Sequence, residues 1–209
     1  MTTDTFAGFE TGHFDAYEER KWASNRFNLE RMRVRECAEG LLKGAVEQLG
    51  DAASSLGISA TADHPSVFNK RKVDSQWVLL GRQAAERKRI GPLLARESSV
   101  REAVEDPLPQ HEEAVLALYI DVSGVEIALR LHEHAHLDRS NLAKQLADDA
   151  RRQELIGLLA ALPAEILVGR SEQAANTISD EQLSEWASKL DQTEWWSLGR
   201  RFDRGDAAV

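Results

Sequence analysis

The sequence has 209 residues, with 26 Lys and Arg against 35 Asp and Glu, which gives a formal net charge of −9. Hydrophobic residues make up 42% and charged residues 29%, an ordinary globular composition that excludes disordered, collagen-like and Pro-rich chains. No apolar run reaches the ~18 residues of a membrane span, no secretory signal is visible, and a single cysteine suits a cytoplasmic protein.

The N-terminal part of the chain is predicted to be helical after a flexible arm. Residues 1–12 are polar and aperiodic, which is typical of an arm that does not pack. Apolar residues then recur at three- and four-residue steps, which predicts helices near 14–26 and 29–49. Asn28 lies between the two and is a suitable N-cap for the second.

Two strands and a broken helix are expected next. Alternating or apolar segments at 58–62 and 73–82 predict strands, separated by a turn. Residues 84–104 have a helix-forming composition, which Gly91-Pro92 is expected to divide into two pieces because proline lacks the amide donor that a helix needs.

A proline-rich linker at Asp106–Pro109 predicts two subdomains that share one sheet. The expected boundaries are 13–106 for the N-terminal subdomain and 110–202 for the C-terminal one, followed by a tail over 203–209.

The most regular segment predicts a β-hairpin over 115–136. Apolar and polar residues alternate from Val125 to Asp138, so the odd positions face a core and the even positions face water or a ligand. A two-residue turn at Ser123-Gly124 joins the strands. The predicted partners are Val122 with Val125, Ile120 with Ile127, Leu118 with Leu129, and Leu116 with Leu131.

Beyond the hairpin we expect a helical segment from about 138 to Pro163, a strand over 164–170, a helix over 179–190 and a last strand over 194–201. Taken together, these elements predict an α+β fold in which an antiparallel sheet with a central hairpin packs against several helices.

Three histidines on the predicted hairpin form a candidate metal site. His132, His134 and His136 share a face at ~7 Å steps, so two of them could ligate one ion with Glu113 as the carboxylate. The alternatives are general acid–base chemistry, or a polar strand face with three neutral histidines that packs beneath a helix. In each case the histidines would make a patch that is sensitive to pH near neutrality.

Three predicted strands end in glycine followed by arginine. If these ends converge, Arg82, Arg170 and Arg200 would form an anion pocket, because the guanidinium fork suits carboxylate and phosphate. The alternative is three separate strand ends, each with a solvated arginine.

A basic segment over 70–89 carries seven cations and two carboxylates. It could bind phosphates, but the negative charge of the whole chain opposes non-specific binding of nucleic acid. A solvated face, or an intramolecular partner for acidic helices, is the alternative.

The sequence favours a non-catalytic binding or adaptor protein with a protein partner, acting through the polar hairpin face and the arginine-ended strands. It contains no phosphate loop, nucleophile elbow, Cys-x-x-Cys or His-Glu-x-x-His pattern. The second hypothesis is a hydrolase that uses a divalent metal cofactor on the histidine strand. The third is a nucleic-acid-associated accessory protein acting through 70–89. No membrane partner is expected.

Overall fold

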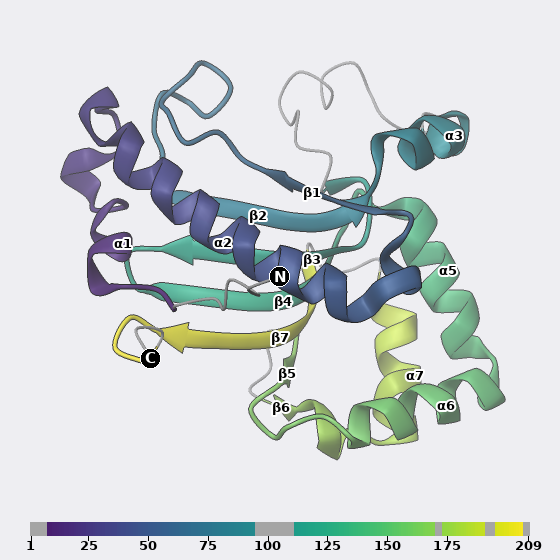
Figure 1. The fold of residues 1–209 in the computed structure, drawn as a ribbon. Helices are drawn as coiled ribbons and strands as arrows, with labels where there is room; N and C mark the ends of the chain where they lie inside the picture. Colours follow the sequence, from purple (N-terminus) through teal and green to yellow (C-terminus); the bar gives the residue numbers. More distant parts are fainter. Residues whose placement is uncertain (1–7, 95–110, 170–172, 191–194, 207–209) are drawn as a thin grey trace. The chain divides into compact units, whose positions relative to one another are not determined.

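The computed structural model of the protein describes residues 8–94, 111–169, 173–190 and 195–206. Its strands form one sheet in the order β1-β2-β3-β4-β7-β5-β6 (Figure 1). The strands are β1 (Leu56–Ala60), β2 (Ser75–Arg82), β3 (Val115–Asp121), β4 (Gly124–His132), β5 (Leu167–Val168), β6 (Gln173–Ala174) and β7 (Trp195–Asp203). The sheet is antiparallel, which confirms the predicted sheet type.

Helices account for most of the remaining described chain, which confirms the α+β class. They are α1 (Thr11–Asp15), α2 (Asn28–Leu49), α3 (Ala84–Leu94), α5 (His136–Ala147), α6 (Asp149–Ala160) and α7 (Asp180–Lys189). Within the described ranges, none of these helices combines the length and the apolarity needed to cross a bilayer.

The contacts of the chain divide it into two units, each with its own apolar core. The first unit contains the described residues up to Arg87, together with 116–127 and the residues from 201 onward. The second contains the described residues of 88–115 and 128–200. Strands β4 and β7 pass from one unit into the other, and the two units are described separately below.

In the first unit, α2 covers one face of β1 and β2 (Figure 1). The middle of the predicted apolar stripe of this helix is buried, because residues four apart lie on one face, whereas Leu49 at its end is exposed. Alternate residues of β2 and β3 pack in the same core as this helix. In the register of the two strands, Val78 is paired with Leu118. Members of this core include Val34, Ala38, Leu42, Val78, Leu80, Leu118 and Ile120. Each buried Val, Leu or Ile contributes about 1.5–3 kcal/mol.

The predicted helix over 14–26 is wrong. The structure has α1 followed by two short 3₁₀ helices, at Glu19–Lys21 and Asn25–Phe27. The fully buried Arg31 explains the difference, because its guanidinium donates to the main-chain carbonyls of Lys21 at 2.5 Å and Ser24 at 3.3 Å. These carbonyls are therefore satisfied without a continuous helix.

The hairpin of β3 and β4 is confirmed, with its turn at Val122 and Ser123, one residue earlier than predicted. The Asp121 carboxylate fixes this turn by accepting the main-chain N–H groups of Ser123 at 2.8 Å and Gly124 at 3.2 Å. A side chain at Gly124 would meet the carbonyl oxygen of Phe202 at 2.1 Å, so β7 requires glycine here.

The second strand of the hairpin ends earlier than predicted, at His132 instead of 136. The main-chain N–H of Ala135 donates to the carbonyl of His132 at 3.0 Å, which turns the chain into α5. The buried Arg139 of α5 also donates to that carbonyl, at 2.7 Å, and to the carbonyls of Leu131 and Leu190. These bonds tie the end of β4 to the end of α7.

The core of the second unit lies among α5, α6, α7 and strands β5 and β7. Its buried members include Leu146, Leu159, Val168, Leu183 and Leu190. A capping box begins the predicted helix over 179–190, since Ser179 and Gln182 bond each other's main-chain N–H groups.

The expected break at Gly91-Pro92 is wrong for the described part of that segment. Helix α3 runs through Pro92 to Leu94. Because proline has no N–H, the helix continues past Pro92 without the bond to the carbonyl of Lys88, four residues earlier. Residues 95–104 and the linker at 106–109 lie outside the described residues, and the subdomains over 13–106 and 110–202 stay predictions.

Candidate functional site

The three predicted histidines do not lie on one strand face. His132 is the last residue of β4 and only 5% exposed, whereas His134 lies half-buried in the following turn and His136 is exposed on α5. Burial on this face follows from aromatic packing. The ring of His132 stacks on His111 at a centroid distance of 4.1 Å and meets Trp195 edge-on at 4.4 Å.

The structure therefore brings two of the three predicted histidines together with one that the sequence did not single out. His132 and His134 have ring centroids 4.7 Å apart, and the Arg130 guanidinium lies 5.5 Å from the Trp195 ring. We call His111, His132, His134 and Trp195 the imidazole–indole cluster. His111 comes 21 positions before His132, so no local pattern could have predicted their stacking.

Burial sets the protonation of His111 and His132. Desolvation lowers the pKa of His111 to about 4, and repulsion from His132 and His134 adds to the effect. Desolvation likewise lowers the pKa of His132 to about 4, with smaller contributions from His134 and Arg139. Both rings are therefore neutral at pH 7, and a base with so low a pKa is a weak proton acceptor for catalysis at neutral pH.

The metal hypothesis gains no support from the described geometry. Across the described ranges, no three His, Cys, Asp or Glu side chains are grouped as a metal site requires. Glu113, the predicted carboxylate ligand, is buried immediately before β3. The three imidazoles of the cluster pack ring against ring, at centroid distances of 4.1 Å and 4.7 Å, and do not form the group of ligands that a zinc site needs.

The predicted anion pocket stays a prediction. Arg82 ends β2 opposite Leu56 of β1 and belongs to the first unit. Arg200 belongs to the second unit, where its Nη1 lies 3.9 Å from the Glu165 carboxylate. Arg170 lies outside the described residues.

The basic segment over 70–89 does not form one patch. Lys70, Arg71 and Lys72 lie on the loop that precedes β2, whereas Arg82 ends that strand and Arg87 lies on α3. The eight residues of β2 separate these groups by about 26 Å, at ~3.3 Å per residue. Phosphate binding by this segment stays a prediction.

A feature that the sequence analysis missed lies on the loop over 64–72, which we call the 64–72 loop. Its tip residues Val67 and Phe68 are 69% and 77% exposed, the most exposed large apolar side chains of the described residues. The signal was present in the sequence, because two large apolar residues stand between Pro65 and Asn69, where a turn leaves them little to pack against.

The backbone of the 64–72 loop is fixed by its own hydrogen bonds. The Asn69 amide accepts the Ser66 N–H at 2.7 Å and donates to the His64 carbonyl at 2.8 Å. The Arg71 N–H donates to the Ser66 carbonyl at 2.7 Å, which closes the turn. The exposed tip is thus presented by an ordered backbone.

Both ends of the loop are attached to helical parts of the first unit. Asp63 forms an ion pair with Arg35 of α2 at 2.7 Å. At the other end, the Val73 N–H donates to the Trp22 carbonyl at 3.0 Å, and the Lys72 ammonium lies 4.9 Å from the Trp22 ring. These attachments limit the movement of the tip.

Two cations next to the tip have a strained backbone. Lys70 and Arg71 have φ values of 54° and 60°, and no other described non-glycine residue has a positive φ. Each costs about 1–2 kcal/mol relative to an ordinary conformation. Within the described chain neither side chain makes an ion pair, whereas Lys72 pairs with Asp74 at 3.1 Å. The loop therefore combines an apolar tip with two unpaired cations.

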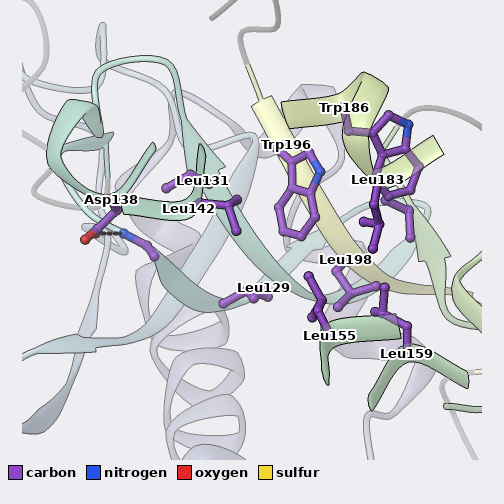
Figure 2. Close-up of a pocket in the computed structure, with 12 residues that line it drawn as sticks. Leu129, Leu131, Asp138, Leu142, Leu155, Leu159, Leu183, Trp186, Trp196 and Leu198 are labelled. Carbon is purple, nitrogen blue, oxygen red and sulfur yellow. Dashed lines mark hydrogen bonds between the residues drawn. The ribbon is translucent and has the colours of Figure 1, made fainter. Parts of the chain in front are cut away.

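The second unit contains an apolar cavity of about 210 Å³ (Figure 2). Its walls come from β4, α5, α6, α7 and β7, and the indole of Trp196 extends toward Leu155 and Leu198. Asp138 is its one charged lining residue, and the carboxylate accepts the Ala114 N–H at 2.7 Å. The two adjacent tryptophans have different surroundings, since Trp195 joins the imidazole–indole cluster and Trp196 lines this cavity.

Compared with known proteins, the sequence matches no family model and no curated protein. Functional proposals for this chain are therefore built from its own residues and their geometry.

Proposed function

We propose that this protein is a non-catalytic binding protein that docks through the 64–72 loop onto an acidic protein surface with an apolar pocket. The observation that carries the proposal is the exposure of Phe68, 77%, beside Val67 on a hydrogen-bonded loop. The proposal keeps the binding role expected from the sequence and moves the working surface away from the hairpin face.

An exposed phenylalanine on an ordered loop is a suitable anchor for a partner. Burying its ring fully is worth up to about 3 kcal/mol. Because the loop backbone is already fixed, binding does not have to order it, and each residue left free would cost about 1–2 kcal/mol. Interfaces concentrate their affinity in such buried aromatic anchors, and arginine is the other residue type enriched there.

The cations beside the tip favour an acidic partner. Lys70 and Arg71 have no ion-pair partner in the described chain, so carboxylates on a partner would gain two counter-charges. A protein partner is favoured over nucleic acid for two reasons. The basic residues are split across the two ends of β2, and the chain as a whole carries −9.

The backbone strain also supports a role for the loop in binding. A left-handed backbone conformation is unfavourable for lysine and arginine. Such strain is concentrated at functional sites, where the geometry of the side chains matters more than stability. Here it holds the two cations directly after the apolar tip.

Site-specific photo-crosslinking tests the proposal. A photoreactive phenylalanine analogue at position 68 is compared with the same analogue at Leu158, which is 63% exposed on α6 in the other unit. In nuclease-treated extract of the source cells, position 68 should crosslink to a discrete acidic protein. Charge reversal by Lys70→Glu with Arg71→Glu should abolish that crosslink.

Equal crosslinking from both positions would show that Phe68 is no anchor. A crosslink that requires intact nucleic acid would favour the nucleic-acid hypothesis instead.

A further inference from the structure

We infer that the cavity of the second unit binds a small, neutral, apolar ring compound of about six to ten heavy atoms. This site belongs to a different unit from the 64–72 loop, and the inference does not depend on the proposed function.

The lining of the cavity defines the chemistry of its ligand. Leucines from β4, α5, α6, α7 and β7 form most of its wall, and the indoles of Trp186 and Trp196 complete it (Figure 2). Such a wall offers dispersion contacts and flat aromatic faces. A ring compound gains most from these surfaces, because offset or edge-on packing against an indole adds to simple burial.

The volume of the cavity limits the size of the ligand. An apolar cavity of about 150 Å³ holds one benzene ring. The volume here is about 210 Å³, which leaves room for one ring with a short substituent. A second fused ring with substituents, or a lipid chain, would exceed it.

Asp138, the one charged residue that lines the cavity, does not favour a cationic ligand. Asp138 lies at the edge of the lining residues in Figure 2, and its Oδ2 already accepts the main-chain N–H of Ala114 at 2.7 Å. A charged ligand would therefore lose its hydration without gaining an adequate partner inside the cavity. A neutral ligand pays no such cost.

A ligand can reach the cavity from solvent. Leu129, in its β4 wall, is 39% exposed, and Leu155, Trp186 and Trp196 are only half-buried although they pack against the core. Large apolar side chains around a hollow with a solvent-facing wall are typical of small-molecule sites.

Titration with toluene tests the inference on the full-length protein, with Leu and Val methyl resonances as the readout. Toluene should shift the methyl signals of Leu155, Leu159 and Leu183 with a dissociation constant on the order of 0.1–1 mM. Benzoate and benzylamine, which add a negative or a positive charge to the same ring, should bind at least about tenfold more weakly.

Matched tryptophan variants on α6 locate the site. Leu155→Trp, inside the cavity, should weaken toluene binding by about tenfold or more because the indole occupies the space. Leu158→Trp, on the solvent side of the same helix, should leave binding within about twofold of wild type. If Leu155→Trp does not fold, Leu129→Phe at the exposed wall should weaken binding in the same direction.

Three results would overturn the inference. They are the absence of methyl shifts with toluene, equal affinities for toluene in Leu155→Trp and Leu158→Trp, and benzylamine binding as tightly as toluene, which would make Asp138 a cation site.

Discussion

The imidazole rings of His111 and His132 lie parallel, with centroids 4.1 Å apart and an interplanar angle of 17°. Both rings are neutral in the folded protein, since burial lowers each pKa to about 4 from 6.5. The stack holds the segment before β3 against the end of β4. The two histidines therefore contribute to the structure of the second unit and also titrate as a pair.

This stack predicts that acid destabilises the protein. The unfolded chain binds protons at these histidines below pH 6.5, whereas the folded chain binds them only near pH 4, so stability is complete above 6.5 and falls as the pH drops from 6.5 to 4. The expected loss is on the order of 2 kcal/mol, allowing for partial solvent screening. Urea unfolding at a series of pH values measures it.

Variants assign that pH dependence to the stack. A His111→Phe and His132→Phe double variant keeps two packed rings without titration, and its stability curve should be flatter between pH 6.5 and 4. A double variant with the wild-type slope would assign the effect to other groups.

Arg139 is predicted to be essential for the stability of the second unit. Arg139→Met would leave the carbonyls of Leu131, His132 and Leu190 without this donor, at an expected cost of about 3–5 kcal/mol. The control is Arg151→Met, an exposed arginine paired with Glu154 on α6, which should change stability by less than about 0.5 kcal/mol. Denaturation followed by tryptophan fluorescence compares them, and equal losses would contradict the role of Arg139.

Two glycine substitutions should change the stability of the protein in opposite directions. Gly124→Ala would place a methyl 2.1 Å from the Phe202 carbonyl oxygen, which backbone movement must relieve at a cost of about 1–3 kcal/mol. Gly40→Ala on α2 meets nothing within 4 Å and should stabilise the helix by about 0.5–1 kcal/mol. Thermal unfolding distinguishes them. A neutral Gly124→Ala would mean that the turn is not pressed against β7.

The backbone strain in the 64–72 loop predicts a gain in stability on substitution. Lys70→Gly removes the left-handed penalty and should raise the free energy of unfolding by about 0.5–1 kcal/mol, even though glycine has more entropy to lose. Lys72→Gly, where φ is not positive, should lower it by a similar amount. If both variants are destabilised equally, the left-handed conformation of Lys70 is not a source of strain.

The parts of the fold that the sequence predicted are those set by local periodicity. Val34, Ala38 and Leu42 recur every four residues and share a buried helix face. The two-residue alternation predicted the strands of the hairpin but not all of their burial, since Leu129 is 39% exposed and Ala128 is buried. The capping box of Ser179 and Gln182 is similarly local.

The parts that could not be predicted depend on contacts between distant residues. His132 ends its strand because Arg139 and Ala135 bond its carbonyl, and its ring is buried by His111 and Trp195. The alternation of apolar and polar residues predicted a longer strand, and it carries no information about these hydrogen-bond donors or these packed rings. The position of Val67 and Phe68 in a predicted turn was a signal for exposure, but its extent depends on the folded loop.

The most direct test of the docking proposal is the affinity of the crosslinked partner, once purified, for matched alanine variants. Calorimetry should show that Phe68→Ala weakens binding by about 10- to 100-fold, whereas Leu158→Ala, equally apolar and also exposed, changes it by less than about twofold. Equal affinities of the two variants would contradict the assignment of the 64–72 loop as the binding surface.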